Sequence, residues 1–160
     1  MFLPYLSGER TPHNDPHAQG VLFGLGHETD AAALAQAVLE GVAFAFRDGL
    51  DALLASGAGI ESIAVIGGGA RSAYWGRILS AVLGRTLTYR DSGAIGPAYG
   101  AARLARMAFE RASIDEVCTP PPILHVVEPD EDLADLYARQ MPRFRGLYQH
   151  LKHSFLETAP

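Results

Sequence analysis

Apolar residues recur at helical spacing in the first half of the chain and predict a long helix. Thr29 or Asp30 can cap its start, and Gly57 can end it after about Ser56. The predicted buried stripe has members three or four positions apart: Leu34, Val38, Val42, Phe46, Leu50 and Leu53. Another face carries the polar residues Gln36, Glu40, Arg47 and Asp51 and is interpreted as a solvated surface. Arg47 and Asp51 are four residues apart, so they can form an ion pair.

The same spacing predicts three further helices. One opens near Arg71–Ser72, ends at Gly84 and buries a stripe of Trp75, Ile78, Leu79, Val82 and Leu83. Another runs from about Ala94 to Glu110 and is rich in small side chains, which let a helix backbone lie close to the surface it covers. The last helix has an expected kink at Pro142 and a stripe of Leu133, Tyr137, Met141, Phe144, Tyr148 and Leu151.

Short apolar runs predict the strands. Four runs are bounded by turn-forming residues: Phe2–Leu6, Gly20–Leu25, Ser62–Ile66 and Thr86–Tyr89. Pro4 indicates an edge position or an irregular start for the first strand, and the polar segment Ser7–Pro16 is predicted to be a loop. Strands and helices alternate from residue 20 to residue 110, so the sequence predicts an α/β fold whose sheet is covered by helices.

The composition narrows the classes of protein to consider. The 160 residues, 48% of them apolar and 19% charged, fit one globular domain. A net charge of −5 without a basic stripe argues against nucleic acid as a partner. Cys118 is the single cysteine, so neither an intrachain disulfide nor a cysteine metal cluster can form. The start of the chain lacks signal-peptide features, and its most apolar segment, Ala31–Phe46, is shorter than the ~20 residues of a membrane span, so we expect a cytoplasmic protein without a membrane partner.

The segment Ser62–Trp75, with the sequence SIAVIGGGARSAYW, carries the candidate chemistry. A buried strand leads into Gly67, Gly68 and Gly69 and then into the start of a helix. Glycines give a ligand access to the backbone, and a helix start offers free N–H groups and a partial positive charge to an anion or an electron-rich ring. The spacing matches neither a P-loop nor the G-x-G-x-x-G dinucleotide fingerprint, so the spacing alone leaves open a tight turn without a ligand.

Five segments, in this order and at these spacings, resemble the C-terminal half of FGGY carbohydrate kinases: FLPYLSGERTP, GVLFGL, LAQAVLEGVAFAFRD, VIGGGARSAYW and GPAYGAARLA. The resemblance covers essentially the whole chain. It implies part of an actin-like, ribonuclease-H-like domain, with helices covering a mixed sheet, in an enzyme that uses ATP and Mg to phosphorylate a sugar. The segments GERTPH and GGGARSAYW resemble the xylulose-phosphorylating members, which implies D-xylulose 5-phosphate as the product. The alternatives are another sugar or polyol (ribulose, gluconate or glycerol) and a non-catalytic interaction module derived from the kinase fold.

The resemblance also implies roles for individual residues. The glycine turn corresponds to the family's adenosine motif, which makes Gly67, Gly68, Gly69 and Ser72 the implied nucleotide contacts. Many relatives have Asn where Ala73 stands, which removes one possible polar contact to the nucleotide. Residues 1–160 correspond to one C-terminal domain, with residues 123–156 as its helical tail.

The resemblance further implies that essential parts lie outside this chain. These are the first strand of the domain, the aspartate base and the N-terminal domain that holds most of the sugar. No catalytic residue is therefore assigned, and the chain alone is expected to be inactive, because phosphoryl transfer depends on positioning and charge neutralisation. A sheet edge left without its neighbouring strand can pair with another copy, so a homodimer is a candidate assembly.

Three other sets of residues are candidates for function. Glu9 and Arg10 lie in a polar loop that the resemblance places near the interdomain cleft, where they either contact ligand or scaffold the loop. Two histidines and an aspartate in the segment His13–His17 have no rigid element to hold them, which argues against a metal site. Trp75 is interpreted as a core residue rather than an adenine-stacking one.

Overall fold

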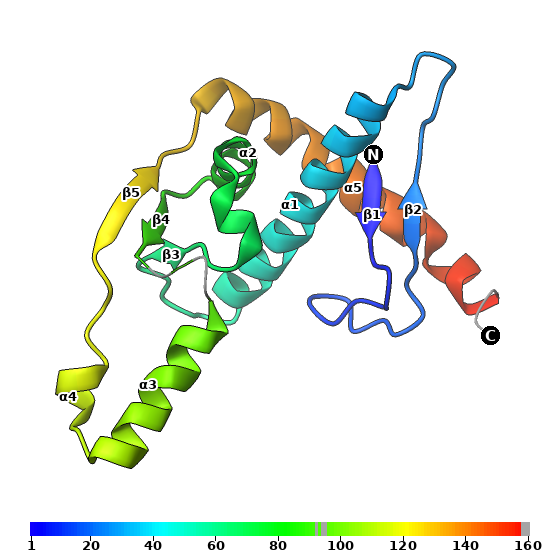
Figure 1. The fold of residues 1–160 in the computed structure, drawn as a ribbon. Helices are drawn as coiled ribbons and strands as arrows, with labels where there is room; N and C mark the ends of the chain where they lie inside the picture. The colour runs from blue at the N-terminus through cyan, green and yellow to red at the C-terminus, as the bar shows by residue number, and fades with distance from the viewer. Residues whose placement is uncertain (92, 94–95, 158–160) are drawn as a thin grey trace.

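Figure 1 shows the fold in a computed structural model, which describes residues 1–91, 93 and 96–157. The elements in chain order are β1 (Phe2–Pro4), β2 (Gly20–Leu22), α1 (Ala31–Ala55), β3 (Ile63–Ala64), the 3-10 turn η1 (Gly68–Arg71), α2 (Ala73–Leu83), β4 (Leu87–Arg90), α3 (Pro97–Glu110), α4 (Ile114–Val117), β5 (Ile123–Val127) and α5 (Glu131–Glu157). All four predicted helices are present, although the predicted start of one at Ala94 lies outside the described residues. Within the described ranges, no helix has the length and apolar character needed to cross a membrane.

The strands form two separate sheets. In the larger sheet the order is β3-β4-β5, with β3 and β4 parallel and β5 antiparallel beside β4. The predicted mixed sheet is therefore confirmed. β1 and β2 pair antiparallel, and Figure 1 shows them on the other side of α1 from the larger sheet. The strand predicted over Ser62–Ile66 is limited to Ile63–Ala64, although Val65 still donates its N–H to the Thr88 carbonyl at 3.0 Å.

The ends of α1 follow the sequence closely. The Asp30 carboxylate accepts the N–H of Ala33 at 2.8 Å, which satisfies one of the free donors at the helix start. At the other end, Ser56 is the C-cap residue and Gly57 follows it with a φ of 87°, a conformation that favours glycine. Local capping chemistry thus sets both boundaries of this helix.

The predicted buried stripe of α1 is wrong for half of its members. Val38, Phe46 and Leu53 are 40%, 54% and 52% exposed. Because α1 is apolar around most of its circumference, residue spacing alone does not identify the buried face. The face that is buried consists of Gly41, Ala43, Phe44, Asp48 and Leu50. The carbonyl oxygen of Phe2 occupies the space where a side chain of Gly41 would lie, so β1 packs directly on the backbone of α1.

The polar face of α1 is not a solvated surface either. The predicted pair forms, with Arg47 Nε 2.8 Å from Asp51 Oδ1. Arg145 of α5 joins it, and its guanidinium lies 2.6 Å from both Asp48 and Asp51. Arg47 also donates to the Val82 carbonyl near the end of α2, at 3.0 Å. These bonds connect α1 to both α2 and α5.

The stripe predicted for α5 is confirmed. Its central members are buried: Tyr137, Met141, Phe144 and Tyr148. The Phe144 ring packs on the Phe44 ring of α1, with centroids 5.4 Å apart. Truncating a buried phenylalanine to alanine costs about 3–5 kcal/mol, so this contact between α1 and α5 is central to the stability of the core. Pro142 lies inside the helix.

The region after β4 differs most from the prediction. Figure 1 shows α3 and α4 projecting away from the rest of the chain, and no residue of α3 is buried. The small side chains of α3 therefore lie against no close-packed surface within the described ranges. The segment 123–156, predicted to be helical, begins with β5, and α5 starts at Glu131.

Candidate functional site

Two turns meet beyond the carboxyl ends of β3 and β4 in the larger sheet. One contains Gly67–Ser72, between β3 and α2, and the other contains Gly93 and Gly96, between β4 and α3. Gly67 donates its N–H to the carbonyl of Gly93 at 2.8 Å, which joins the two turns. Both turns follow the carboxyl ends of parallel strands, and open α/β sheets bind ligands at such ends. These joined turns are therefore the candidate site.

The three consecutive glycines have different surroundings. Gly67 has a φ of 86°, in the region that favours glycine. A Cβ on Gly69 would lie 2.7 Å from the ring of Trp75, too close for a real side chain. A Cβ on Gly68 would meet one neighbouring atom among the described residues, Nη2 of Arg71 at 3.6 Å, which is an ordinary contact distance. The surface above Gly68 is therefore open to a ligand.

The backbone of the turn presents hydrogen-bond donors. The N–H groups of Gly68 and Gly69 begin η1 and have no backbone acceptor among the described residues. Ser72 caps α2, because its Oγ accepts the N–H of Trp75 at 3.2 Å, and no described residue accepts its O–H. The structure thus brings Gly67, Gly68, Gly69 and Ser72 onto one short loop, as predicted, and their contact with a nucleotide stays a prediction.

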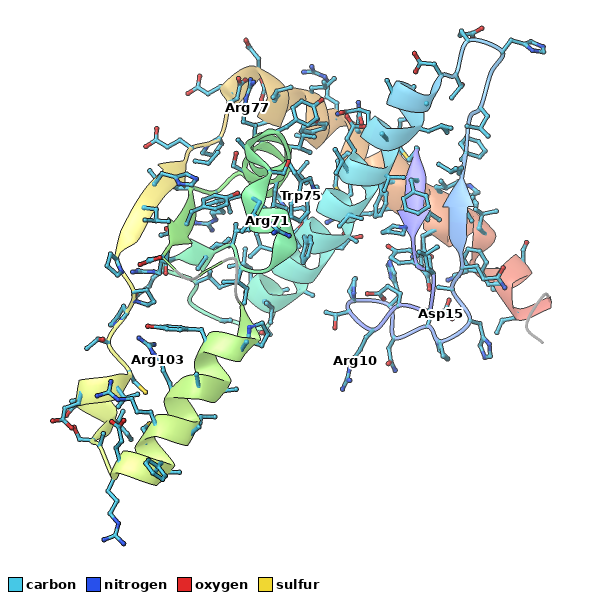
Figure 2. The ribbon with its side chains drawn as sticks, viewed as in Figure 1. Arg10, Asp15, Arg71, Trp75, Arg77 and Arg103 are labelled. Carbon is cyan, nitrogen blue, oxygen red and sulfur yellow. The ribbon has the colours of Figure 1, made fainter. Side chains whose placement is uncertain are left out.

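Positive charge at this turn comes from one side chain and one helix. Arg71 is exposed, and its Nε lies 3.5 Å from the Gly68 carbonyl oxygen. The helix α2 begins at Ala73, and its dipole adds a partial positive charge beside Ser72. Figure 2 shows Arg71 and Trp75 at this turn. The site is suited to an anionic ligand.

Trp75 supports the turn from within the fold. Its ring lies against Gly69, and its centroid is 6.2 Å from that of Phe46 on α1. It is among the partly buried side chains that pack on the hydrophobic core, which confirms its interpretation as a core residue. Trp75 is also the only tryptophan of the chain, so its fluorescence reports on the environment of the glycine turn.

The loop between β1 and β2 holds the other predicted candidates. Glu9 accepts the N–H of His13 at 2.7 Å, which supports the loop-scaffolding role. Asp15 accepts the hydroxyl of Tyr148 at 3.0 Å; burial and this carboxylate raise the pKa of Tyr148 to about 12. Arg10, labelled in Figure 2, lines a groove beside α1. In the described ranges, no group of three or more His, Cys, Asp or Glu side chains is placed to hold a metal ion.

A chain of polar side chains that positions α2 was not predicted. Tyr74 donates its hydroxyl to Gln36 at 2.6 Å, and Gln36 donates to Glu40 at 2.7 Å. Glu40 also accepts the hydroxyl of Tyr137 on α5, at 3.2 Å. Burial, together with the charge of Glu40, raises the pKa of Tyr137. The four-residue spacing of Gln36 and Glu40 was a sequence signal for one of these bonds, but their other partners lie on different helices.

Known proteins resemble this chain over most of its length. Residues 1–109 match the profile of the "FGGY family of carbohydrate kinases, C-terminal domain". A xylulose kinase of Escherichia coli is 50% identical over 154 residues, which are 94% of this chain and 31% of that protein. A solved "xyloylose kinase" from Brucella ovis has a TM-score of 0.82 at 46% identity, over 94% of this chain and 31% of its own. A solved gluconate kinase from Lactobacillus acidophilus has a TM-score of 0.81 at 25% identity, over 99% of this chain and 32% of its own. The chain therefore spans about a third of the length of these relatives. The similarity to the solved kinase structures confirms the predicted actin-like, ribonuclease-H-like fold class.

Proposed function

This chain belongs to the FGGY family of carbohydrate kinases, and we propose that it is the nucleotide-binding C-terminal part of an ATP-dependent kinase. The single observation that carries the proposal is the joined glycine turn, where, among the described residues, the surface above Gly68 is open and the N–H groups of Gly68 and Gly69 have no backbone acceptor. Those N–H groups and the Ser72 hydroxyl would bind the nucleotide. The bond from Gly67 to Gly93 would hold the turn in place for it.

The proposed sugar substrate is D-xylulose, phosphorylated on its 5-hydroxyl to D-xylulose 5-phosphate. The support for it is the 50% identity to the Escherichia coli xylulose kinase. The gluconate kinase structure has nearly the same TM-score as the Brucella ovis structure, 0.81 against 0.82, so another sugar or polyol is the alternative. The sugar contacts are proposed to come from the two thirds of the relatives' length that this chain does not span.

The chemistry assigned to this chain is binding rather than proton transfer. Phosphoryl transfer depends largely on positioning the nucleotide and neutralising its charge. The chain would contribute by fixing the adenosine end of ATP, while Mg accompanies the phosphates. No described residue is assigned to the metal or to a catalytic base, so the chain alone is expected to bind nucleotide without phosphorylating sugar. We place the enzyme in the cytoplasm, where ATP is abundant.

A homodimer is also proposed, with a second copy of this chain as the occupant of a groove beside α1. The groove has a volume of about 770 Å³ and is lined by apolar residues of α1, by Ile60 and Ile63, and by loop residues that include Arg10. β3 is the edge strand of its sheet within the described ranges. An open strand edge is self-complementary about a twofold axis, which favours a second copy over an unrelated partner.

Calorimetry with ADP tests the nucleotide site. Gly68→Leu places a side chain in the open space above the turn, and Gly59→Leu is a matched control because its surroundings are also open. We expect ADP binding by the unaltered chain and by Gly59→Leu, with loss of binding in Gly68→Leu. Equal ADP binding by Gly68→Leu would show that the nucleotide binds away from this turn. Binding by none of the three proteins would favour a non-catalytic interaction module.

A further inference from the structure

One charged side chain of the glycine turn is left without a charged partner. Arg71 ends η1, its side chain is exposed, and within the described ranges its side chain donates only to the Gly68 carbonyl, at 3.5 Å. That distance is at the outer limit for an N–H···O bond. Several other arginines pair with carboxylates: Arg47, Arg77, Arg106 and Arg145. Among the described residues, Arg71 has no such pair.

We propose that Arg71 binds the phosphate groups of the nucleotide and so makes the site prefer ADP and ATP to adenosine. This inference rests on the proposed nucleotide site, because Arg71 lies on the same turn as Gly68. Its guanidinium nitrogen Nη2 would lie 3.6 Å from a Cβ of Gly68, and it therefore borders the open surface above that residue. Figure 2 shows the side chain at the turn.

Charge balance favours this role. The nucleotide is a multiply charged anion, whereas the chain has a formal net charge of −5. Between Gly67 and Ser72, Arg71 is the only charged residue. The free N–H groups and the start of α2 supply partial charges only, of roughly half an elementary charge for a whole helix. A full positive charge at this turn must therefore come from Arg71.

The shape of the side chain fits the same role. A guanidinium group presents its N–H donors as a planar fork, which matches two oxygens of a phosphate group. The weak bond to the Gly68 carbonyl holds the side chain near the turn, and a phosphate oxygen can replace it at little cost. Lysine would keep the charge but lose the paired geometry.

The test compares ADP with adenosine on the full chain, by calorimetry and by the fluorescence of Trp75. The variants are Arg71→Ala and Arg71→Lys, with Arg139→Ala as the control, since Arg139 is exposed on α5. We expect Arg71→Ala to weaken ADP binding about tenfold or more, as for loss of one charge-assisted pair. Adenosine binding should not change, Arg71→Lys should be intermediate, and the control should match the unaltered chain.

Two outcomes would overturn the inference while leaving the nucleotide site intact. The first is an ADP affinity that Arg71→Ala does not change. The second is an equal loss of ADP and adenosine binding in Arg71→Ala, which would place Arg71 on the base or the ribose. If the unaltered chain binds neither ligand, the proposed nucleotide site itself is wrong and the role of Arg71 is refuted with it.

Discussion

Replacing Gly69 by alanine tests how the glycine turn is built. A Cβ at this position would lie 2.7 Å from Cζ3 and 3.0 Å from Cε3 of Trp75. Carbon atoms in contact lie about 3.5–4.0 Å apart, so the indole ring or the turn must move by about 1 Å. The ring cannot withdraw freely, because it packs on the hydrophobic core. Overpacking of this kind costs about 1–3 kcal/mol.

The matched variant is Gly68→Ala, at the neighbouring position that has room for a side chain. Gly68 does not require a positive φ, so alanine there should be neutral or should stabilise the chain by up to about 1 kcal/mol through the unfolded state. For a chain of this size, each 1 kcal/mol shifts the melting temperature by about 2–4 °C. We therefore expect Gly69→Ala to melt several degrees below Gly68→Ala.

The assay is thermal and urea unfolding followed by far-ultraviolet circular dichroism, which does not depend on the tryptophan. A double-mutant cycle then identifies the cause. In a Trp75→Leu background, where the ring is gone, Gly69→Ala should cost less than about 0.5 kcal/mol. If Gly69→Ala is as stable as Gly68→Ala, or if its cost persists without the ring, the packing of Trp75 on the turn is not what requires glycine at this position.

Two further predictions concern the helices around the site. Burial alone would raise the pKa of Asp51, but hydrogen bonds from Arg145 and Arg47 outweigh it and lower the pKa below its ordinary value of 3.8. The ionised carboxylate therefore stabilises the fold above that pH. The difference in stability between the unaltered chain and Asp51→Asn should shrink as the pH falls through 3.8 and below. Glu61→Gln, at an exposed residue, is the control and should leave the stability unchanged. A difference for Asp51→Asn that does not change with pH would contradict this. For the proposed homodimer, light scattering should give a dimer for the unaltered chain and for Phe109→Glu, but a monomer for Phe46→Glu, because Phe46 lines the groove beside α1 whereas Phe109 lies on the projecting α3. A monomeric unaltered chain, or a dimeric Phe46→Glu, would refute the groove as the contact.

The sequence predicted those parts of the fold that local chemistry determines. Asp30, Ser72 and Gly84 are caps whose role depends on their nearest neighbours along the chain, and the structure confirms all three as helix boundaries. The buried face of α1 was predicted wrongly because several of its faces are apolar, and the choice among them is made by β1 and α5. The strand β5 was not predicted, since its sequence, ILHVV, follows a proline-rich segment and forms a strand only by pairing with β4.

The same distinction applies to the candidate site. Gly67, Gly68, Gly69 and Ser72 follow one another along the chain, and a strand, three glycines and a helix cap are visible in the sequence. Gly93 was not predicted, because its contribution is a carbonyl that accepts from a residue 26 positions earlier, 2.8 Å away. Nothing in the composition of its own segment indicates that bond. The network through Tyr74 and Glu40 was missed for the same reason, since it joins three helices.

The three glycines do not support a ligand equally. Gly67 is explained by its positive φ, and Gly69 is explained by the ring of Trp75 against it, so the fold itself requires glycine at both positions. Gly68 has neither a positive φ nor a close neighbour among the described residues. The N–H groups of this turn have no backbone acceptor in the described part of the chain, and the turn lies at the carboxyl end of a parallel strand. A small residue without a structural requirement at such a place is most simply explained by a ligand that lies against it. The nucleotide hypothesis therefore depends on Gly68, and the variant that separates binding from folding is a substitution at this residue.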